Sequence, residues 1–184
     1  KVVVITGGAK KIGRSTALKL AEQGFNILIH TGGKSVNGAK TTVKLVKEFK
    51  VKAHYVLGDL ANTKTIKKIK MAAEKLGVPS ILINNAGLRI FENFENIKYK
   101  DWKKVMSVNV DASFLCAQAL IKHMTKQKWG RIINIGGLSG HIGAKERAHV
   151  VTSKAALIGL TKAISMEFLD CLLYTSPSPR DSSK

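Results

Sequence analysis

Cysteine is scarce in this sequence, which has two cysteines among 184 residues. Two cysteines cannot build the dense disulfide framework of a small secreted domain. No apolar run approaches the roughly 20 residues that cross a bilayer. No signal segment opens the chain, and no cluster of His and Cys has metal-ligand spacing. We therefore expect a globular, cytoplasmic protein with one domain, no metal site and no membrane partner.

Acidic residues are also few, since 12 Asp and Glu accompany 31 Lys and Arg, for a formal net charge of +19. Such an excess suggests a polyanionic partner such as nucleic acid. Only five of the 31 are arginine, and the lysines are scattered rather than interleaved with aromatic residues in a stripe. We therefore predict a solvated basic surface and no nucleic-acid partner. The alternative predicts a duplex affinity that falls steeply with salt.

Short β-branched segments alternate with longer amphipathic ones, which is typical of repeated βαβ units. The predicted strands are 2–6, 26–30, 52–57, 80–84 and 130–136, and the predicted helices are about 12–24, 37–49, 62–76, 101–128 and 148–169. Right-handed crossovers place the first strand near the middle of the sheet. We predict an α/β fold, a Rossmann-like doubly wound parallel sheet with helices on both faces, incomplete at its C-terminal edge. Its ligand is expected at the carboxyl ends of the strands, where the strand order reverses.

A glycine-containing turn joins the first strand to the first helix, and it reads Thr6-Gly7-Gly8-Ala9-Lys10-Lys11-Ile12-Gly13. Gly7 can adopt the positive φ of a tight turn. The missing side chain at Gly13 is expected to let a ligand approach the helix N-terminus. The unpaired N–H groups and dipole there suit a diphosphate.

This turn resembles the Thr-Gly-x-x-x-Gly-x-Gly signature of the short-chain dehydrogenase/reductase family, with Lys11 in place of the middle glycine. Further matches are Asp59 in Gly58-Asp59-Leu60, the turn Asn84-Asn85-Ala86-Gly87, Asn109, and Lys154, which matches the lysine of the family's Tyr-x-x-x-Lys motif. The resemblance covers residues 2–170 and implies an NAD(P)(H)-dependent oxidoreductase that acts on a small carbonyl or alcohol substrate. The implied cofactor-binding residues are Thr6, Gly7, Lys10, Lys11, Ile12, Gly13, Thr31, Lys34, Asp59, Leu60, Asn85, Ala86, Gly87 and Lys154.

The residues after the second strand favour NADP(H) over NAD(H). A carboxylate at the end of that strand would bind the ribose hydroxyls of NAD and repel a 2′-phosphate. Thr31 stands there instead, and Lys10 and Lys34 can attract the extra phosphate. The alternative, that both are ordinary surface lysines, stays open.

Two of the four catalytic positions that the resemblance implies are replaced. Val150 stands where the family has its tyrosine acid, and Gly137 stands where it has its serine, whereas Asn109 and Lys154 are present. His149 and Ser139 are our candidate replacements, together with Lys154 itself; His141, Thr152 and Ser153 also lie close in sequence. Either a non-standard proton donor supports turnover, or the protein binds NADP(H) without catalysis.

The predicted domain spans residues 1–170. Residues 171–184 contain two prolines and a run of serines that break the helical pattern. They resemble the translation of a sequencing adapter, so we expect a disordered, read-through tail on a fragment whose substrate lid is missing. By resemblance, the complete protein is expected to form a homo-oligomer, a dimer or tetramer.

Overall fold

Five parallel strands form a single sheet in the computed structural model, which describes residues 1–169. The strands are β1 (Val2–Thr6), β2 (Asn26–Thr31), β3 (Ala53–Leu57), β4 (Pro79–Asn84) and β5 (Arg131–Asn134), in the order β3-β2-β1-β4-β5. The strand order therefore reverses between β2 and β4, on either side of β1, as expected. The predicted tail at 171–184 lies outside the described residues.

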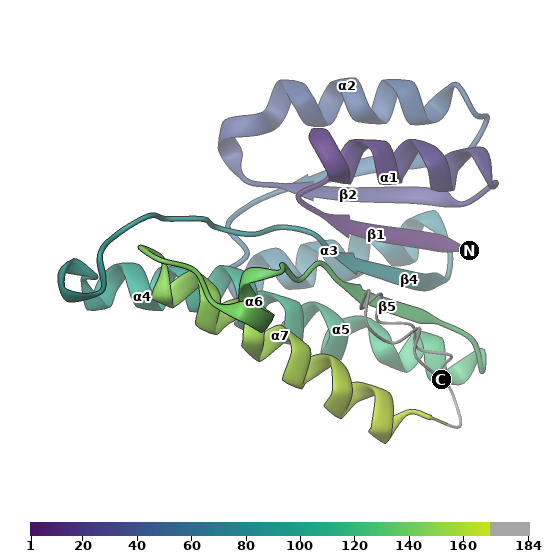
Figure 1. The fold of residues 1–184 in the computed structure, drawn as a ribbon. Coiled ribbons are helices and arrows are strands. Elements are labelled where there is room, and N and C mark those ends of the chain that lie inside the picture. Colours follow the sequence, from purple (N-terminus) through teal and green to yellow (C-terminus); the bar gives the residue numbers. More distant parts are fainter. Residues whose placement is uncertain (170–184) are drawn as a thin grey trace.

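Helices cover both faces of the sheet (Figure 1). One face packs against α1 (Lys11–Glu22) and α2 (Val36–Lys47), through small residues such as Ala17 and Ala39. The other packs against α3 (Thr63–Leu76), α5 (Ala112–Lys126) and the end of α7 (Ala148–Glu167). Val2 to Ile5 of the central strand β1 are fully buried, as expected for a strand covered on both faces. The predicted doubly wound α/β fold is confirmed.

The predicted helix over 101–128 is interrupted in the structure. It consists of α4 (Tyr99–Met106), a π-helical segment η3 (Ser107–Asp111) and α5. A wide turn of this kind is frequent at functional sites, and hydrophobic periodicity alone does not reveal it. Three short helices also lie outside the prediction, namely η1 (Gly33–Ser35), η2 (Phe94–Asn96) and α6 (Ser139–Ile142).

Within residues 1–169, no helix is both long enough and apolar enough to span a bilayer. The same residues contain no group of three His, Cys, Asp or Glu side chains placed to hold a metal ion.

Candidate active site

The turn between β1 and α1 is closed by glycines at both ends. Gly7 has a φ of +67°, as predicted. A Cβ on Gly13 would lie 2.4 Å from the carbonyl oxygen of Gly7 and 2.8 Å from Nδ2 of Asn85. The turn itself therefore needs glycine at 13, which is a stronger reason than the ligand approach expected from the sequence.

Lys11, at the position of the family's middle glycine, has a φ of +49°. A left-handed backbone costs a residue with a side chain about 1–2 kcal/mol. The first turn of α1 contains no acidic side chain, and Lys10 before it makes no capping hydrogen bond. The N-terminus of α1 is therefore open to an anion.

Thr6 and Asn85 tie this turn to the one that follows β4. Oγ1 of Thr6 accepts hydrogen bonds from the backbone N–H groups of Asn85 (3.1 Å) and Ala86 (3.0 Å). Nδ2 of Asn85 donates to the carbonyl oxygens of Thr6 and Gly7, both at 3.0 Å. Thr6 is buried and does not line the cleft, so it acts on the site by holding the two turns together.

A cleft of about 710 Å³ lies at the carboxyl ends of β1, β2 and β4. It brings together most of the predicted cofactor-binding residues, namely Gly7, Lys10, Lys11, Ile12, Gly13, Thr31, Lys34, Asp59, Leu60, Asn85, Ala86 and Gly87. Sequence reasoning missed several further lining residues, among them His30, Lys104 and Val108. His30 precedes Thr31 at the carboxyl end of β2, so its position in the sequence could have identified it as a cleft residue.

His30 forms part of the cleft wall as a buried imidazole. Its Nε2 lies 2.9 Å from the carbonyl oxygen of Gly58. Burial lowers the pKa of His30, although the hydrogen bond to Gly58 and the charge of Asp59 act in the opposite direction. The imidazole is therefore neutral near pH 7 and adds no positive charge to the cleft.

Lys154, which was also predicted to bind the cofactor, is not among the residues that line the cleft, but it lies next to Gly87, which does line it. Its Nζ donates a hydrogen bond of 2.7 Å to the carbonyl oxygen of Ile135, which follows β5. The same Nζ is 3.7 Å from the position that a Cβ on Gly87 would take. Burial lowers the pKa of Lys154, and the positive charge of Arg89 lowers it further.

Asn109 holds the segment after Gly87 from within η3. Its Oδ1 accepts a hydrogen bond of 2.7 Å from the N–H of Leu88, and its Nδ2 donates to the carbonyl oxygen of Leu88 at 3.1 Å. Nδ2 also donates to Oγ of Ser153 at 2.9 Å. Asn109 is fully buried, so its side chain acts by positioning the Leu88 backbone and α7.

The candidate replacements for the missing serine and tyrosine differ in position. Oγ of Ser139 lies 3.7 Å from the position that a Cβ on Gly137 would take, so its hydroxyl is close to the family's serine position. His149 is fully buried, and neither ring nitrogen has a hydrogen-bond partner among the described residues. Val150 beside it is buried as well. The structure therefore brings Ser139 near the site and seals His149 away from it.

Comparison with known proteins agrees with this geometry. The family described as short chain dehydrogenase matches residues 1–171. The chain belongs to the short-chain dehydrogenase family. Members of this family are oxidoreductases that bind NAD(H) or NADP(H).

Two curated relatives illustrate the range of the family. An uncharacterized oxidoreductase of Thermotoga maritima is 36% identical over 170 residues, which are 92% of this chain and 66% of the relative. An L-rhamnose 1-dehydrogenase (NADP(+)) of Thermoplasma acidophilum is 37% identical over 168 residues, 90% of this chain and 66% of the relative. The chain thus spans about two thirds of the length of these relatives.

The fold is also shared with a solved structure. The crystal structure of acetoin dehydrogenase YohF from Salmonella typhimurium matches with a TM-score of 0.90 and 32% identity, over 100% of this chain and 77% of that one.

Proposed function

We propose that this short-chain dehydrogenase is an NADP(H)-dependent oxidoreductase of a carbonyl or alcohol substrate, with Lys154 as its proton donor. One observation carries the proposal. The site has basic residues at the end where β2 and α1 meet and a half-buried lysine at the end between β4 and β5. The first end suits a phosphorylated ribose, and the second suits the reacting carbonyl.

The preference for NADP(H) is supported by a second hollow next to the cleft. This hollow has about 430 Å³ and shares Lys10, Gly33, Lys34 and Ser35 with the cleft. It is also lined by Arg14, whose Nη2 donates to the carbonyl oxygens of Ala9 (2.8 Å) and Gly38 (3.2 Å). No acidic residue lines this hollow, so a 2′-phosphate would meet three cations and no carboxylate. The NADP(+) in the name of the Thermoplasma relative points the same way.

Reduction of a carbonyl needs a hydride and a proton, and bound NADPH supplies the hydride. The ammonium of Lys154 is held by Ile135 beside Gly87, and it can give a proton to the developing alkoxide and regain one from solvent. Its lowered pKa makes the ammonium a stronger acid than that of an ordinary lysine. In this proposal the hydroxyl of Ser139 orients the carbonyl oxygen, which is supported by its distance of 3.7 Å from the Cβ position of Gly137. His149 is not among the proposed donors because it is sealed from the cleft.

Titration of the protein with NADPH and NADH, followed by turnover assays with a panel of carbonyl compounds, tests this function. We expect tighter binding of NADPH. Replacing Lys10 and Lys34 together with glutamine removes two charged contacts worth about 1–3 kcal/mol each, so NADPH should bind at least about 10-fold more weakly while NADH changes little. Lys40→Gln, on the exposed surface of α2, is the matched control. The assignment would be refuted if neither NADPH nor NADH showed saturable binding.

A second candidate function is non-catalytic binding of NADP(H), for sensing or for support of an oligomer. The replacement of the tyrosine and serine positions by Val150 and Gly137 favours it. Formation of a ternary complex with NADPH and a carbonyl compound, without loss of the hydride, would select this candidate. Loss of measurable turnover in Lys154→Ala would select the enzyme.

The remaining predictions concern the setting of the protein. We infer a homo-oligomer in a cytoplasmic location, with no nucleic-acid partner. Phe114 on α5 is 45% exposed and Met166 on α7 is 70% exposed, and they provide apolar surface for a second copy. Light scattering of the purified chain tests the oligomer, and a salt-dependent duplex titration tests the nucleic acid.

A further inference from the structure

We propose that Arg89 and Arg147, together with Lys154, bind an anionic group of the substrate, so that the carbonyl compound carries a carboxylate or a phosphate. This inference rests on the proposed function and adds the substrate class to it. It depends on two arginines that belong to neither the cofactor cleft nor the family motifs identified in the sequence.

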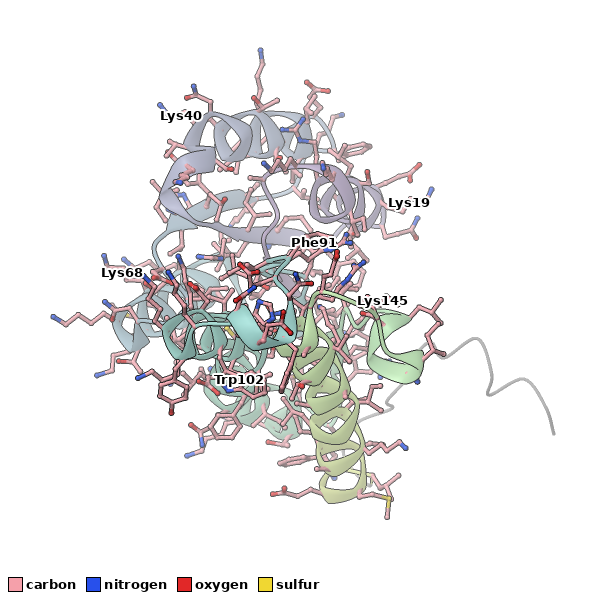
Figure 2. The ribbon with its side chains drawn as sticks, turned by 60° about the vertical axis from the view of Figure 1, so that its left-hand side comes forward. Lys19, Lys40, Lys68, Phe91, Trp102 and Lys145 are labelled. Atoms are coloured by element: carbon pink, nitrogen blue, oxygen red, sulfur yellow. The ribbon has the colours of Figure 1, made fainter. Side chains whose placement is uncertain are left out.

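The two arginines come from separate segments and meet at one aromatic ring. Arg89 follows the turn after β4, and Arg147 directly precedes α7. The Cζ atoms of Arg147 and Arg89 lie 4.4 Å and 5.9 Å from the centroid of the Phe91 ring. Figure 2 shows the side of the molecule on which Phe91 and Lys145 lie.

A backbone hydrogen bond joins these segments. The N–H of Glu92 donates to the carbonyl oxygen of Glu146 at 2.7 Å, next to Phe91 in one segment and next to Arg147 in the other. The arginines are therefore held against a common ring by a tied pair of loops. This preorganisation lowers the entropy lost when both guanidinium groups bind one ligand.

The positive charge of this cluster has no acidic partner among the described residues. The ion pairs there are Lys19–Glu22, Lys70–Glu74 and His123–Glu74, and none includes Arg89, Arg147 or Lys154. The charge of Arg89 also reaches Lys154, where it lowers the pKa of the ammonium. Glu92 and Glu146 are the neighbouring acidic residues in sequence, and neither forms an ion pair with the two arginines at Phe91, so both guanidinium groups can attract a ligand anion.

The cofactor phosphates do not account for these arginines. The cleft is lined by the turn and the N-terminus of α1, by Leu88 after β4, and by Lys104 and Val108, but by neither arginine. A diphosphate at the N-terminus of α1 would lie within this cleft, and Lys154 is not among the residues that line it. Arg89 and Arg147 meet at Phe91, and the charge of Arg89 acts on Lys154, so this proposal assigns the substrate anion to the two arginines.

A guanidinium group recognises carboxylate and phosphate through paired, parallel N–H donors, whereas a neutral carbonyl or hydroxyl gains less from it. A substrate anion between the arginines would also offset the repulsion of Arg89 on Lys154. The ammonium would then remain protonated until the alkoxide develops. One charged group would thus both select the substrate and sustain its proton donor.

Matched pairs of probes test this substrate class. The pairs are acetoacetate with its methyl ester, and dihydroxyacetone phosphate with dihydroxyacetone, assayed for kcat/KM with NADPH. We expect one charged probe to exceed its neutral partner at least about 10-fold, and Arg89→Gln and Arg147→Gln each to reduce that advantage at least about 10-fold. Arg131→Gln is the control, because Arg131 also lies over an aromatic ring, Trp129, but at the opposite end of β5.

Calorimetric titration with the two anions, with and without NADPH, keeps this test independent of turnover. The anion site would be overturned if the unmodified protein showed equal kcat/KM for the charged and the neutral member of each pair. The site would also be overturned if Arg89→Gln and Arg147→Gln both kept the same preference for the charged probe as Arg131→Gln. If NADPH fails to bind while an anion still binds through the two arginines, the proposed function is refuted and the anion site is retained.

Discussion

The Nζ atom of Lys154 donates a hydrogen bond of 2.7 Å to the carbonyl oxygen of Ile135. This contact joins the middle of α7 to the end of β5, and it holds a half-buried ammonium group beside Gly87. An ammonium group has three N–H donors, so the contact with Ile135 leaves two for a substrate or a cofactor. The predicted behaviour of Lys154 follows from this geometry.

Carbonyl reduction is expected to fall as pH rises through the pKa of Lys154, because the ammonium form supplies the proton. Burial and Arg89 place that pKa below the ordinary lysine value of 10.5. The activity should therefore be high at low pH and fall as the pH rises, and the midpoint of this fall should lie below pH 10.5. A pH profile of kcat at saturating NADPH measures this.

Lys154→Gln provides the comparison for the pH profile. It should lower kcat by at least about 100-fold, within the range of general acid catalysis, and remove the alkaline limb. A variant that keeps both the rate and the limb would show that the proton comes from elsewhere. NADPH titration of the same variant separates loss of chemistry from loss of binding.

Gly13→Ala is predicted to open the turn between β1 and α1. The added Cβ would lie 2.4 Å from the carbonyl oxygen of Gly7, so backbone must move. We expect a loss of about 1–3 kcal/mol in unfolding free energy and weaker NADPH binding. Gly159→Ala in α7 is the control, because its Cβ meets no atom within 4 Å, and it should gain about 1 kcal/mol from helix propensity. Urea denaturation of both variants checks the contrast; equal stabilities would contradict it.

Lys11→Gly should relieve backbone strain. At a φ of +49°, glycine avoids the cost of a left-handed side-chain residue. We expect an unchanged or higher unfolding free energy, by up to about 1 kcal/mol. The neighbouring variant Lys10→Gly should instead lose about 0.5–1 kcal/mol, because Lys10 has an extended backbone with a φ of −161°. Denaturation midpoints that shift equally in both variants would show that strain at Lys11 does not matter.

The strands and most helices could be predicted from the sequence because burial on both faces leaves continuous β-branched segments such as Val2 to Ile5. The cleft residues could be predicted because strand ends and a glycine turn place them. The π-helical segment η3 around Asn109 could not be predicted, since Asn109 forms hydrogen bonds with Leu88, which is 21 positions away. The Arg89, Phe91 and Arg147 cluster also depends on loops that meet only in the folded chain, and no periodicity marks it.

The burial of His149 was equally invisible in the sequence. A histidine beside the vacant tyrosine position suggested a donor, but a one-residue difference on a helix turns the side chain by about 100°. Ser139 is the reverse case. It lies two residues from the family's serine position, and the short helix α6 brings its Oγ to 3.7 Å from the Cβ position of Gly137.

Ser139 is therefore predicted to replace the missing serine, and a rescue experiment can show it. Ser139→Ala should lower kcat/KM by about 10-fold, the cost of one hydrogen bond of roughly 1.4 kcal/mol to the reacting oxygen. Gly137→Ser has room, because a Cβ there would lie 3.7 Å from Oγ of Ser139 and 3.9 Å from Cγ of Lys154. In the Ser139→Ala background, Gly137→Ser should restore most of the activity, whereas Gly137→Ala should not. Unchanged kcat/KM in Ser139→Ala would remove Ser139 from the site.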